Sequence, residues 1–452
     1  MTKRAYLTAP PASDKMPKGI PYILTNEAAE RFAFYGMRCI LVYFMTHHLL
    51  GPDGTLAPMS EEKSKMWFHF FVSAVYFTPL LGALLSDALL GIFPTVIIFS
   101  LVYCAGFFTL AFNHTQTGLA VALALIAIGS GIIKPCVTAN VGNQFGKTNR
   151  HLMAKVYSWF YWSINLGAVI SNLLVPKLLA RYGPSVAFGV PAALMFVATV
   201  AFWLGRWEFV HIPRAGFGFV KECFSGEGLR ALLKLGIIYL FVAPFWAIFD
   251  QMDSAWVLLA EKLDRHWLWY DWESSQIVAA NPFLILILIP AFSYVIYPAI
   301  NRVFPLTPLR KIGIGLLLAG SPFAVSALIE YRIAAGGKPS IAWMFFAYVL
   351  LTSAEILVSI TALEFSYTQA PKKMKSFVMA VFFLSISLGN TFTAIVNHVI
   401  ENPDGTSKLA GANYYWFFVA VMVVTAVLYI PVAMRYPAKE YIQDEASDEP
   451  EQ

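Results

Sequence analysis

Long apolar runs separated by short polar segments dominate the sequence. Twelve of these runs reach the length of about 20 residues at which a helix crosses a lipid bilayer. None shows the strict alternation of a barrel strand, so the pattern predicts twelve transmembrane helices. The runs lie near residues 22–47, 66–90, 94–113, 118–141, 154–180, 186–206, 235–260, 275–300, 311–333, 341–368, 375–399 and 412–435.

The composition excludes several classes of protein. Apolar residues make up 58% of the chain and charged residues 13%, whereas soluble proteins have about 45–50% and about 25%. A soluble enzyme, a disordered regulator and a disulfide scaffold are therefore excluded. The net charge of +5 does not indicate nucleic-acid binding, because the basic residues lie in short loops. No C-x-x-C pair, zinc motif, P-loop or catalytic triad is present, so we expect no metal, no cofactor and no enzymatic activity.

The distribution of Lys and Arg predicts the orientation in the membrane. An even number of spans places both termini on one side, and that side carries about 20 Lys and Arg against about nine on the other. Positive loops face the cytosol, so we expect both termini to be cytosolic. Six spans precede a polar segment and six follow it. The sequence thus predicts an all-α membrane protein of major facilitator architecture, with two six-helix bundles and a substrate site between them.

This organisation divides the chain into five parts. We expect a cytosolic tail at 1–20, a first bundle at 21–206, a cytosolic linker at 207–234, a second bundle at 235–436 and an acidic cytosolic tail at 437–452.

Ionisable residues within the first span indicate a functional site. Glu27, Glu30 and Arg31 stand at i, i+3 and i+4, so a helix places them on one face. One interpretation is a purely structural ion pair within the membrane. The other is a proton and anion site, in which the Arg binds a carboxylate and a Glu carries protons.

Two further charges interrupt later spans. Lys134 lies near the end of its span, where a lysine often extends to the membrane surface. Glu355 lies well inside its span, and we expect it to need a cationic partner. A carboxylate opposite an Arg and a Lys would form a dipolar cavity suited to a zwitterion.

Other polar residues in the spans have two interpretations each. His69 is a candidate proton sensor, because imidazole changes charge near neutral pH, or a buried histidine with satisfied hydrogen bonds. Asp250 and Asp253 stand one turn apart as a candidate proton site, although Asp253 could simply cap the turn. Asn165 and Asn281 could bind substrate or only bond across helices.

Two long motifs identify a family. EAAERFAFYG at 27–36 resembles the E-x-x-E-R-F-x-Y-Y-G motif of the proton-coupled oligopeptide transporter family. FYWSINLG at 160–167 resembles that family's F-Y-x-x-I-N-x-G signature. The likeness continues through YFTPLLGALLSDALLG, IGSGIIKP, FWAIFDQ and SAEILVSITALEF, and so covers nearly the whole chain.

The resemblance implies a major facilitator fold and proton-driven import of di- and tripeptides across the cell membrane by a monomer. It implies that Arg31 and Lys134 bind the peptide carboxylate, and that Glu355 with Asn165 and Asn281 binds the amino terminus. The side-chain pockets would be lined by Tyr35, Tyr76, Trp246 and Phe382. Proton coupling would involve Glu27, Glu30, His69 and Asp250, and Asp87 would help to close the cytosolic gate.

The chain departs from the family pattern at a few positions. Phe34 replaces a Tyr, Ala168 stands where Ser is common, and Asn143 replaces an Asp. Ile-Phe-Pro follows Gly91 where basic residues are usual, so the cytosolic gate could be held differently. Two alternatives stay open: a family member that transports another small zwitterion or anion, and a receptor that senses peptide without moving it.

Overall fold

The computed structural model describes residues 6–212, 216, 226–369 and 375–436, and these are almost entirely helical. Eleven helical segments in these ranges are long and apolar enough to cross a membrane. Helix α1 (Ile20–His47) has 28 residues and packs among them. It is the twelfth span by length, and its four charged residues, Glu27, Glu30, Arg31 and Arg38, lower its apolar character.

The first half of the molecule, residues 6–212, contains six long helices that pack on one another. They are α1, α2 (Glu61–Leu84), α3 (Ile92–Phe112), α4 (Gln116–Asn143), α5 (Met153–Tyr182) and α6 (Pro184–Leu204). Short 3-10 or π-helical turns are η1 (Leu85–Leu90), η2 (Arg150–Leu152) and η3 (Gly205–Trp207). Close helix approach depends on small residues: a Cβ on Gly167 of α5 would lie 2.8 Å from the carbonyl oxygen of Ala28 in α1.

The second half, residues 226–436, also has six spans, but four of them are interrupted. The first is α8 (Gly226–Phe249), η4 (Asp250–Asp253) and α9 (Ala255–Glu261); the second is η5 (Ser274–Ala279), α10 (Ala280–Ala291), η6 (Phe292–Ile296) and α11 (Tyr297–Asn301). The third is α12 (Pro308–Ala319) with α13 (Ser321–Ala334), and the fourth is α14 (Ala342–Glu355), η7 (Ile356–Ile360) and α15 (Thr361–Gln369). The unbroken spans are α16 (Lys375–Ile400) and α17 (Ala412–Arg435).

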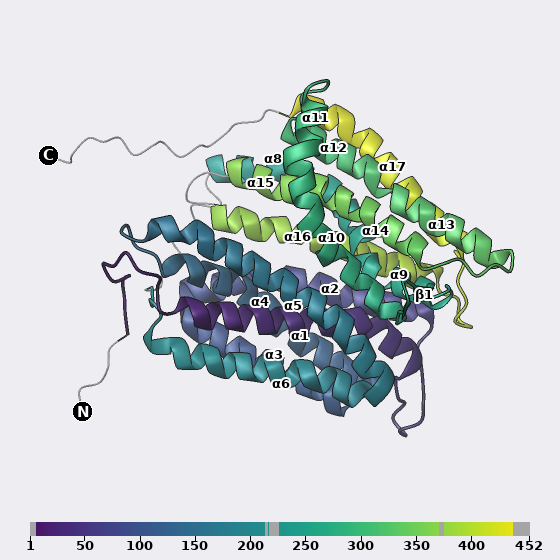
Figure 1. The fold of residues 1–452 in the computed structure, drawn as a ribbon, viewed down its shortest axis with the longest axis horizontal. Coiled ribbons are helices and arrows are strands. Elements are labelled where there is room, and N and C mark those ends of the chain that lie inside the picture. The colour runs from purple at the N-terminus through teal and green to yellow at the C-terminus, as the bar shows by residue number, and fades with distance from the viewer. Residues whose placement is uncertain (1–5, 213–215, 217–225, 370–374, 437–452) are drawn as a thin grey trace.

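The two halves form two layers that meet along α2 and α16 (Figure 1). A small antiparallel hairpin, β1 (His266–Trp267) with β2 (Tyr270–Asp271), lies at one end of the molecule. We call this end the hairpin end. Helix α1 begins at the opposite end, which we call the tail end (Figure 1).

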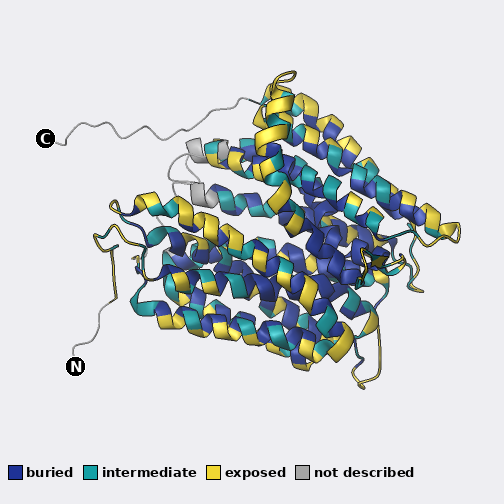
Figure 2. Cartoon of the chain, in the orientation of Figure 1, coloured by how far each residue is buried: buried dark blue, intermediate teal, exposed yellow. Residues whose placement is uncertain are grey.

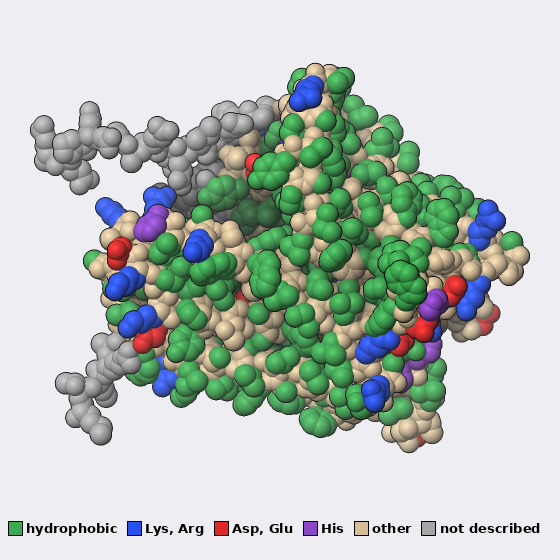
Figure 3. Space-filling model, viewed as in Figure 1, with side chains coloured by type: hydrophobic (Ala, Val, Ile, Leu, Met, Phe, Trp, Pro, Cys, Tyr) green, Lys and Arg blue, Asp and Glu red, His purple; other side chains and the backbone are tan. Residues whose placement is uncertain are grey.

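Contacts between the halves concentrate at the hairpin end. There α1 packs against η4, α9 and η5, and α5 packs against η5. Buried residues gather in the same region (Figure 2). The space-filling view is hollowed between the halves on the side of the tail end (Figure 3). The structure is therefore closed at the hairpin end.

Candidate functional site

The charged residues of α1 form a compact triad in the first half. Arg31 Nε lies 3.0 Å from Glu27 Oε1 and 2.5 Å from Glu30 Oε2. The hydroxyl of Ser130 in α4 donates a hydrogen bond of 3.4 Å to Glu30 Oε1. All three charged residues are more than nine-tenths buried. One guanidinium thus lies between two carboxylates on one helix face, as the spacing predicts.

Lys134 of α4 lies beside this Arg31 triad. Its Nζ is 4.6 Å from the ring centre of Phe34 and 4.4 Å from that of Tyr76. These contacts place the ammonium among aromatic rings of the interior, so the expectation that it could extend to the membrane surface is wrong. Among the described side chains, no carboxylate lies within 4.0 Å of Lys134. The Phe34 ring offers a cation–π contact that needs no hydroxyl.

Glu355 is the last residue of α14, directly before the π-helical turn η7. Asn281 of α10 donates hydrogen bonds to Glu355 Oε2 at 2.8 Å and to the hydroxyl of Thr352 at 3.1 Å. The cationic partner that the sequence led us to expect is not found within 4.0 Å among the described residues. Among the described residues, the Asn281 amide is the group that donates a hydrogen bond to this half-buried carboxylate. The π-helical turn that follows it is a feature frequent at functional sites.

Asn165 is not joined to these two residues by any hydrogen bond in the described part of the chain. Its amide donates to the carbonyl oxygen of Tyr161, one turn earlier in α5, at 2.9 Å. Tyr161 is 45% exposed, and α5 packs against α10, the helix that carries Asn281. Asn165 therefore lies on a helix that packs beside the Glu355–Asn281 pair.

The four predicted aromatic pocket residues lie on four different helices, two in each half. Tyr76 of α2 contacts the ring of Phe383 in α16 at 6.0 Å between ring centres. Phe383 in turn contacts Phe382, which is 6.2 Å away. Tyr35 and Trp246 complete the set: the former lies 6.0 Å below the Arg31 guanidinium, and the latter packs on Phe249 of α8.

A second arginine triad, which the sequence analysis did not single out, joins the two halves. Arg38 of α1 forms ion pairs with Asp250 and, at 2.9 Å, with Asp253, both in η4. All three are at most 2% exposed. Arg38 interrupts an apolar run two turns after Arg31, which is the signal that could have revealed it. Asp253 is an ion-pair partner here and not merely a turn cap.

His69 of α2 belongs to the same network. Its Nδ1 lies 2.7 Å from Asn390 Oδ1, and its Nε2 lies 2.9 Å from the Ser254 hydroxyl. The Asn390 amide donates to Asp250 Oδ2 at 2.6 Å, so Nδ1 of His69 must be the donor to Oδ1. The serine hydroxyl can donate to a neutral ring or accept from a protonated one. Both ring nitrogens of His69 thus have hydrogen-bond partners.

Further polar contacts join the halves near the hairpin end. The Ser73 hydroxyl lies 2.9 Å from that of Ser387 and 2.7 Å from that of Thr391. The hydroxyl of Ser60 donates to Glu401 Oε1 at 2.6 Å. This end is thus held by buried hydrogen bonds as well as by the Arg38 triad.

At the tail end the structure describes one departure from the family pattern, the Ile-Phe-Pro segment, but not the side chain of the predicted gate residue Asp87. Phe93, in the Ile-Phe-Pro segment, packs on Phe202, Phe209 and His211 within the first half. An aromatic cluster therefore occupies the place where basic residues are usual in the family. The side chain of Asp87, in η1, lies outside the described part of the structure.

Broken helices, two bundles and charges buried between them match the architecture of the major facilitator class of membrane transporters. A sequence model described as the POT family matches residues 93–225 and 221–417. The chain therefore belongs to the POT family of proton-dependent oligopeptide transporters, and the predicted fold and family are confirmed. It is a multi-pass membrane protein.

Solved structures agree with this assignment. An auto-inhibited POT family peptide transporter is 33% identical, with a TM-score of 0.84 over 95% of this chain and 99% of the other. The POT family transporter PepTSo is 34% identical, with a TM-score of 0.85 over 93% and 99%.

Curated relatives are longer than this chain. Peptide transporter family 1 of Drosophila melanogaster is 36% identical over 70% of this chain and 48% of its own length. Solute carrier family 15 member 2 of Homo sapiens is 32% identical over 77% and 54%. The chain thus spans about half the length of these relatives. Their names describe transporters, in agreement with the prediction of a transporter and not an enzyme.

Proposed function

We propose that the protein is a proton-coupled symporter that imports di- and tripeptides by alternating access. The observation that carries this proposal is the separation of charge between the halves. Arg31 and Lys134 belong to the first half, whereas Glu355 with Asn281 belongs to the second. A peptide has a carboxylate at one end and an ammonium at the other, so it can bind both halves at once. Relatives named as peptide transporters support the same substrate class.

Because the peptide would contact both halves, its binding would favour closure of the two halves around it. A ligand shifts a conformational equilibrium only by its differential affinity for the two states. A molecule that touches both halves has that differential affinity, because the contacts to one half are lost when the halves separate. Lys134, with no carboxylate partner among the described residues, is the cation ready for the peptide carboxylate.

Proton coupling follows from competition for Arg31. Glu27 and Glu30 both hold its guanidinium in the present arrangement. Protonation of either carboxylate would weaken that hold and let Arg31 bind the peptide carboxylate. Loss of the proton on the other side of the membrane would restore the triad and promote release of the peptide. Coupling between the two ligands is reciprocal, as linkage requires.

The Arg38 triad would link protons to the gate. A proton on Asp250 or Asp253 would weaken the ion pairs between α1 and η4, and His69 reaches the same aspartate through Asn390. Low pH on the hairpin side would therefore favour its opening. We propose that this side faces outward in the plasma membrane, with both termini cytosolic, so that the structure represents the inward-facing state.

We also propose the domain bounds, the gate residue, the functional unit and the peptide contacts that the sequence predicts. The bundles would comprise residues 21–206 and 235–436, joined by the linker at 207–234. Asp87 would close the cytosolic side, and the functional unit would be the monomer. Asn165, Tyr35, Tyr76, Trp246 and Phe382 would contact the peptide.

Uptake of labelled dialanine into proteoliposomes tests the proposal. Accumulation should require an inward proton gradient, and unlabelled di- and tripeptides should block it while free alanine should not. Saturable binding without accumulation would instead indicate a receptor. Absence of binding would indicate that another zwitterion or anion is the substrate.

A further inference from the structure

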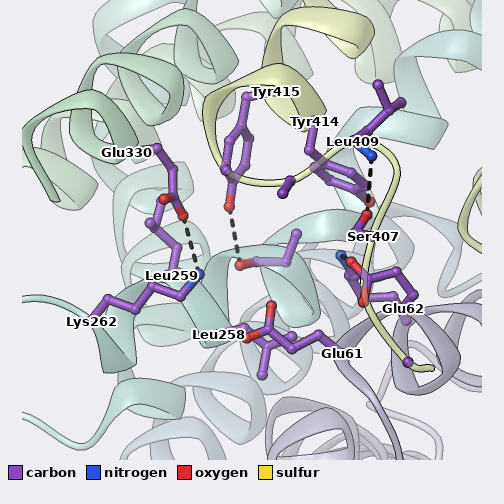
Figure 4. A pocket seen from close by; sticks show the side chains of 15 residues that line it. Glu61, Glu62, Leu258, Leu259, Lys262, Glu330, Ser407, Leu409, Tyr414 and Tyr415 are labelled. Atoms are coloured by element: carbon purple, nitrogen blue, oxygen red, sulfur yellow. Dashed lines mark hydrogen bonds and ion pairs between the residues drawn. The ribbon is translucent and has the colours of Figure 1, made fainter. Parts of the chain in front are cut away.

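A cavity lies between the halves at the hairpin end, away from Arg31 and Glu355. Its volume is about 300 Å³, at the lower limit of about 300–1,000 Å³ for small-ligand sites. Helix α2 contributes one wall, and α9, α13, α17 and residues 405–411 contribute the others. Figure 4 shows Glu61, Glu62, Lys262 and Tyr415 converging on it from these elements. Neither half alone could form this cavity.

The cavity carries one unbalanced negative charge. Glu62 pairs with Lys65 at 3.5 Å, and Glu330 pairs with Lys262 at 3.3 Å. Glu62, Lys65 and Glu330 are more than nine-tenths buried. Glu61 also lines the cavity, and it has no ion pair within 4.0 Å among the described residues. Three carboxylates thus face two ammonium groups.

The field of these carboxylates acts on Lys262, which follows the last residue of α9. Burial disfavours its charge and would lower its pKa, but the attraction of Glu61 and Glu330 outweighs burial and raises the pKa. The positive charge of Lys262 is therefore stabilised although water is partly excluded.

Aromatic rings complete the lining. Tyr414 and Tyr415 are each 4% exposed, and the Lys65 ammonium lies 4.1 Å from the ring centre of Tyr414. Carboxylates combined with tyrosine faces are the chemistry that binds organic ammonium ions. A metal ion is a poorer fit, because no group of three or more potential ligands is arranged to hold one among the described residues.

We propose that this cavity binds a small organic ammonium ion and that the bound cation holds the hairpin end closed. Binding itself does not depend on the proposed function; only its effect on transport rests on the symport cycle. Because the lining comes from both halves, the cation must leave or lose half of its contacts when this end opens. By linkage, a concentration ten times the Kd lowers the relative population of the open state about tenfold.

Equilibrium binding of radiolabelled tetramethylammonium to the purified full chain tests the site. This ion has a fixed charge, so it does not alter proton gradients. We expect one saturable site, and Glu61→Gln should weaken binding about tenfold. Glu61 is exposed, so this change leaves the fold intact. Glu364→Gln, at an exposed glutamate of α15, is the matched control and should bind like the parent. Absence of saturable binding, or equal affinity in Glu61→Gln, overturns the proposal.

Spin labels at Asp53→Cys and Asp404→Cys test the second part. Of the native cysteines, Cys39, Cys104 and Cys136 are buried, and Cys223→Ser removes the fourth. Saturating tetramethylammonium should shift the distances between these exposed loops of the two halves toward the closed state. Sodium chloride at equal ionic strength and tert-butanol, a neutral molecule of similar shape, should not. An unchanged distribution at saturation would refute the effect on closure. If dialanine is not transported at all, the symporter proposal fails while both of these measurements still decide this one.

Discussion

Two arginines stand two turns apart on α1, and each lies between two carboxylates. Arg31 pairs with Glu27 and Glu30 of its own helix, whereas Arg38 pairs with Asp250 and Asp253 of the other half. Each triad has one guanidinium and two carboxylates, but the carboxylates belong to the same helix in one triad and to the other half in the other. The Arg31 triad can persist while the halves separate, because all of its members move together. The Arg38 triad must break.

This difference assigns the triads different tasks in one cycle. The Arg31 triad lies within one half, so protons and the peptide would act on it at the same place. Its protonation would affect the other half only through the bound substrate. A triad between the halves contributes directly to the free-energy difference between open and closed states. The pair therefore separates recognition from gating on one rigid helix, at a distance of two helical turns. Changes at the recognition site and changes at the contacts between the halves should therefore have separable effects.

The largest effect should follow removal of the cation at the gate. Arg38→Gln leaves two buried aspartates without their cationic partner. This change should destabilise the closed state of the hairpin end, relative to the open state, by roughly 3–5 kcal/mol at neutral pH. Spin labels at Asp53→Cys and Asp404→Cys should then report a predominantly open hairpin end. The defect should shrink in acid, because protonated aspartates no longer need the arginine.

Arg181→Gln is the control for this change, since Arg181 is an exposed arginine near the end of α5 and should leave the distances unchanged. If Arg38→Gln leaves the hairpin end closed, the hydrogen bonds of Ser73 and Ser60 carry closure and the Arg38 triad is not the gate.

Removal of the second-half carboxylate should affect recognition and not gating. Glu355→Ala removes the group that would bind the peptide ammonium. We expect the binding free energy of dialanine to become less favourable by roughly 2–3 kcal/mol, because a hydrogen bond between charged groups is lost. N-acetyl-dialanine, which lacks the ammonium, should bind the variant and the parent equally. Equilibrium binding of both ligands provides the measurement. A parent-like affinity for dialanine would exclude Glu355 as the amine site.

A neutral residue at the Arg31 triad should mimic a permanently bound proton. Glu30→Gln leaves only Glu27 to compete for Arg31, so dialanine should bind roughly tenfold more tightly at pH 7.5, a change of about 1.4 kcal/mol. At low pH the parent is itself protonated and the two affinities should converge. Concentrative uptake should lose its dependence on the proton gradient, while the spin-label distances stay as in the parent. Gradient-driven uptake at the parent level would disprove coupling through Glu30.

Much of the fold could be predicted because membrane helices are specified locally. The length of an apolar run and its loop charges are properties of neighbouring residues, and the spans agree with the helices to within a few residues at most ends. The Arg31 triad was predictable for the same reason, since i, i+3 and i+4 fix which side chains meet. The interruptions of the second half, such as the π-helical turn after Glu355, have no comparable local pattern.

The sequence shows Arg38 as a charge in an apolar run, but its ion pairs could not be predicted, because Arg38 lies more than 200 residues from Asp250 and meets it only through the packing of the halves. Asp250 was singled out as a proton site, but its partner was not. His69 shows the same limit: its two hydrogen bonds reach Ser254 and Asn390, whose proximity depends on how α2 packs on η4 and α16. For Lys134 the sequence left open whether the ammonium extends to the membrane surface or lies in the interior, because sequence does not show which aromatic rings surround it.

Loss of a single hydroxyl should distinguish contacts between the halves from contacts within the first half. Ser73→Ala removes two hydrogen bonds across the halves, and Ser130→Ala removes one bond within the first half. Each neutral hydrogen bond contributes about 1 kcal/mol, so Ser73→Ala should destabilise the closed hairpin end by roughly 1–2 kcal/mol and broaden the spin-label distances. Ser130→Ala should instead alter the pH dependence of dialanine binding slightly and leave the distances as they are. Both serines are small and buried, and the same atom is deleted from each. The two variants can have different kinds of effect only if closure depends on whether the hydrogen-bond partner of the serine lies in the same half or in the other half. Equal broadening in both variants would mean that the halves respond as one body, and the separation of recognition from gating would then be wrong.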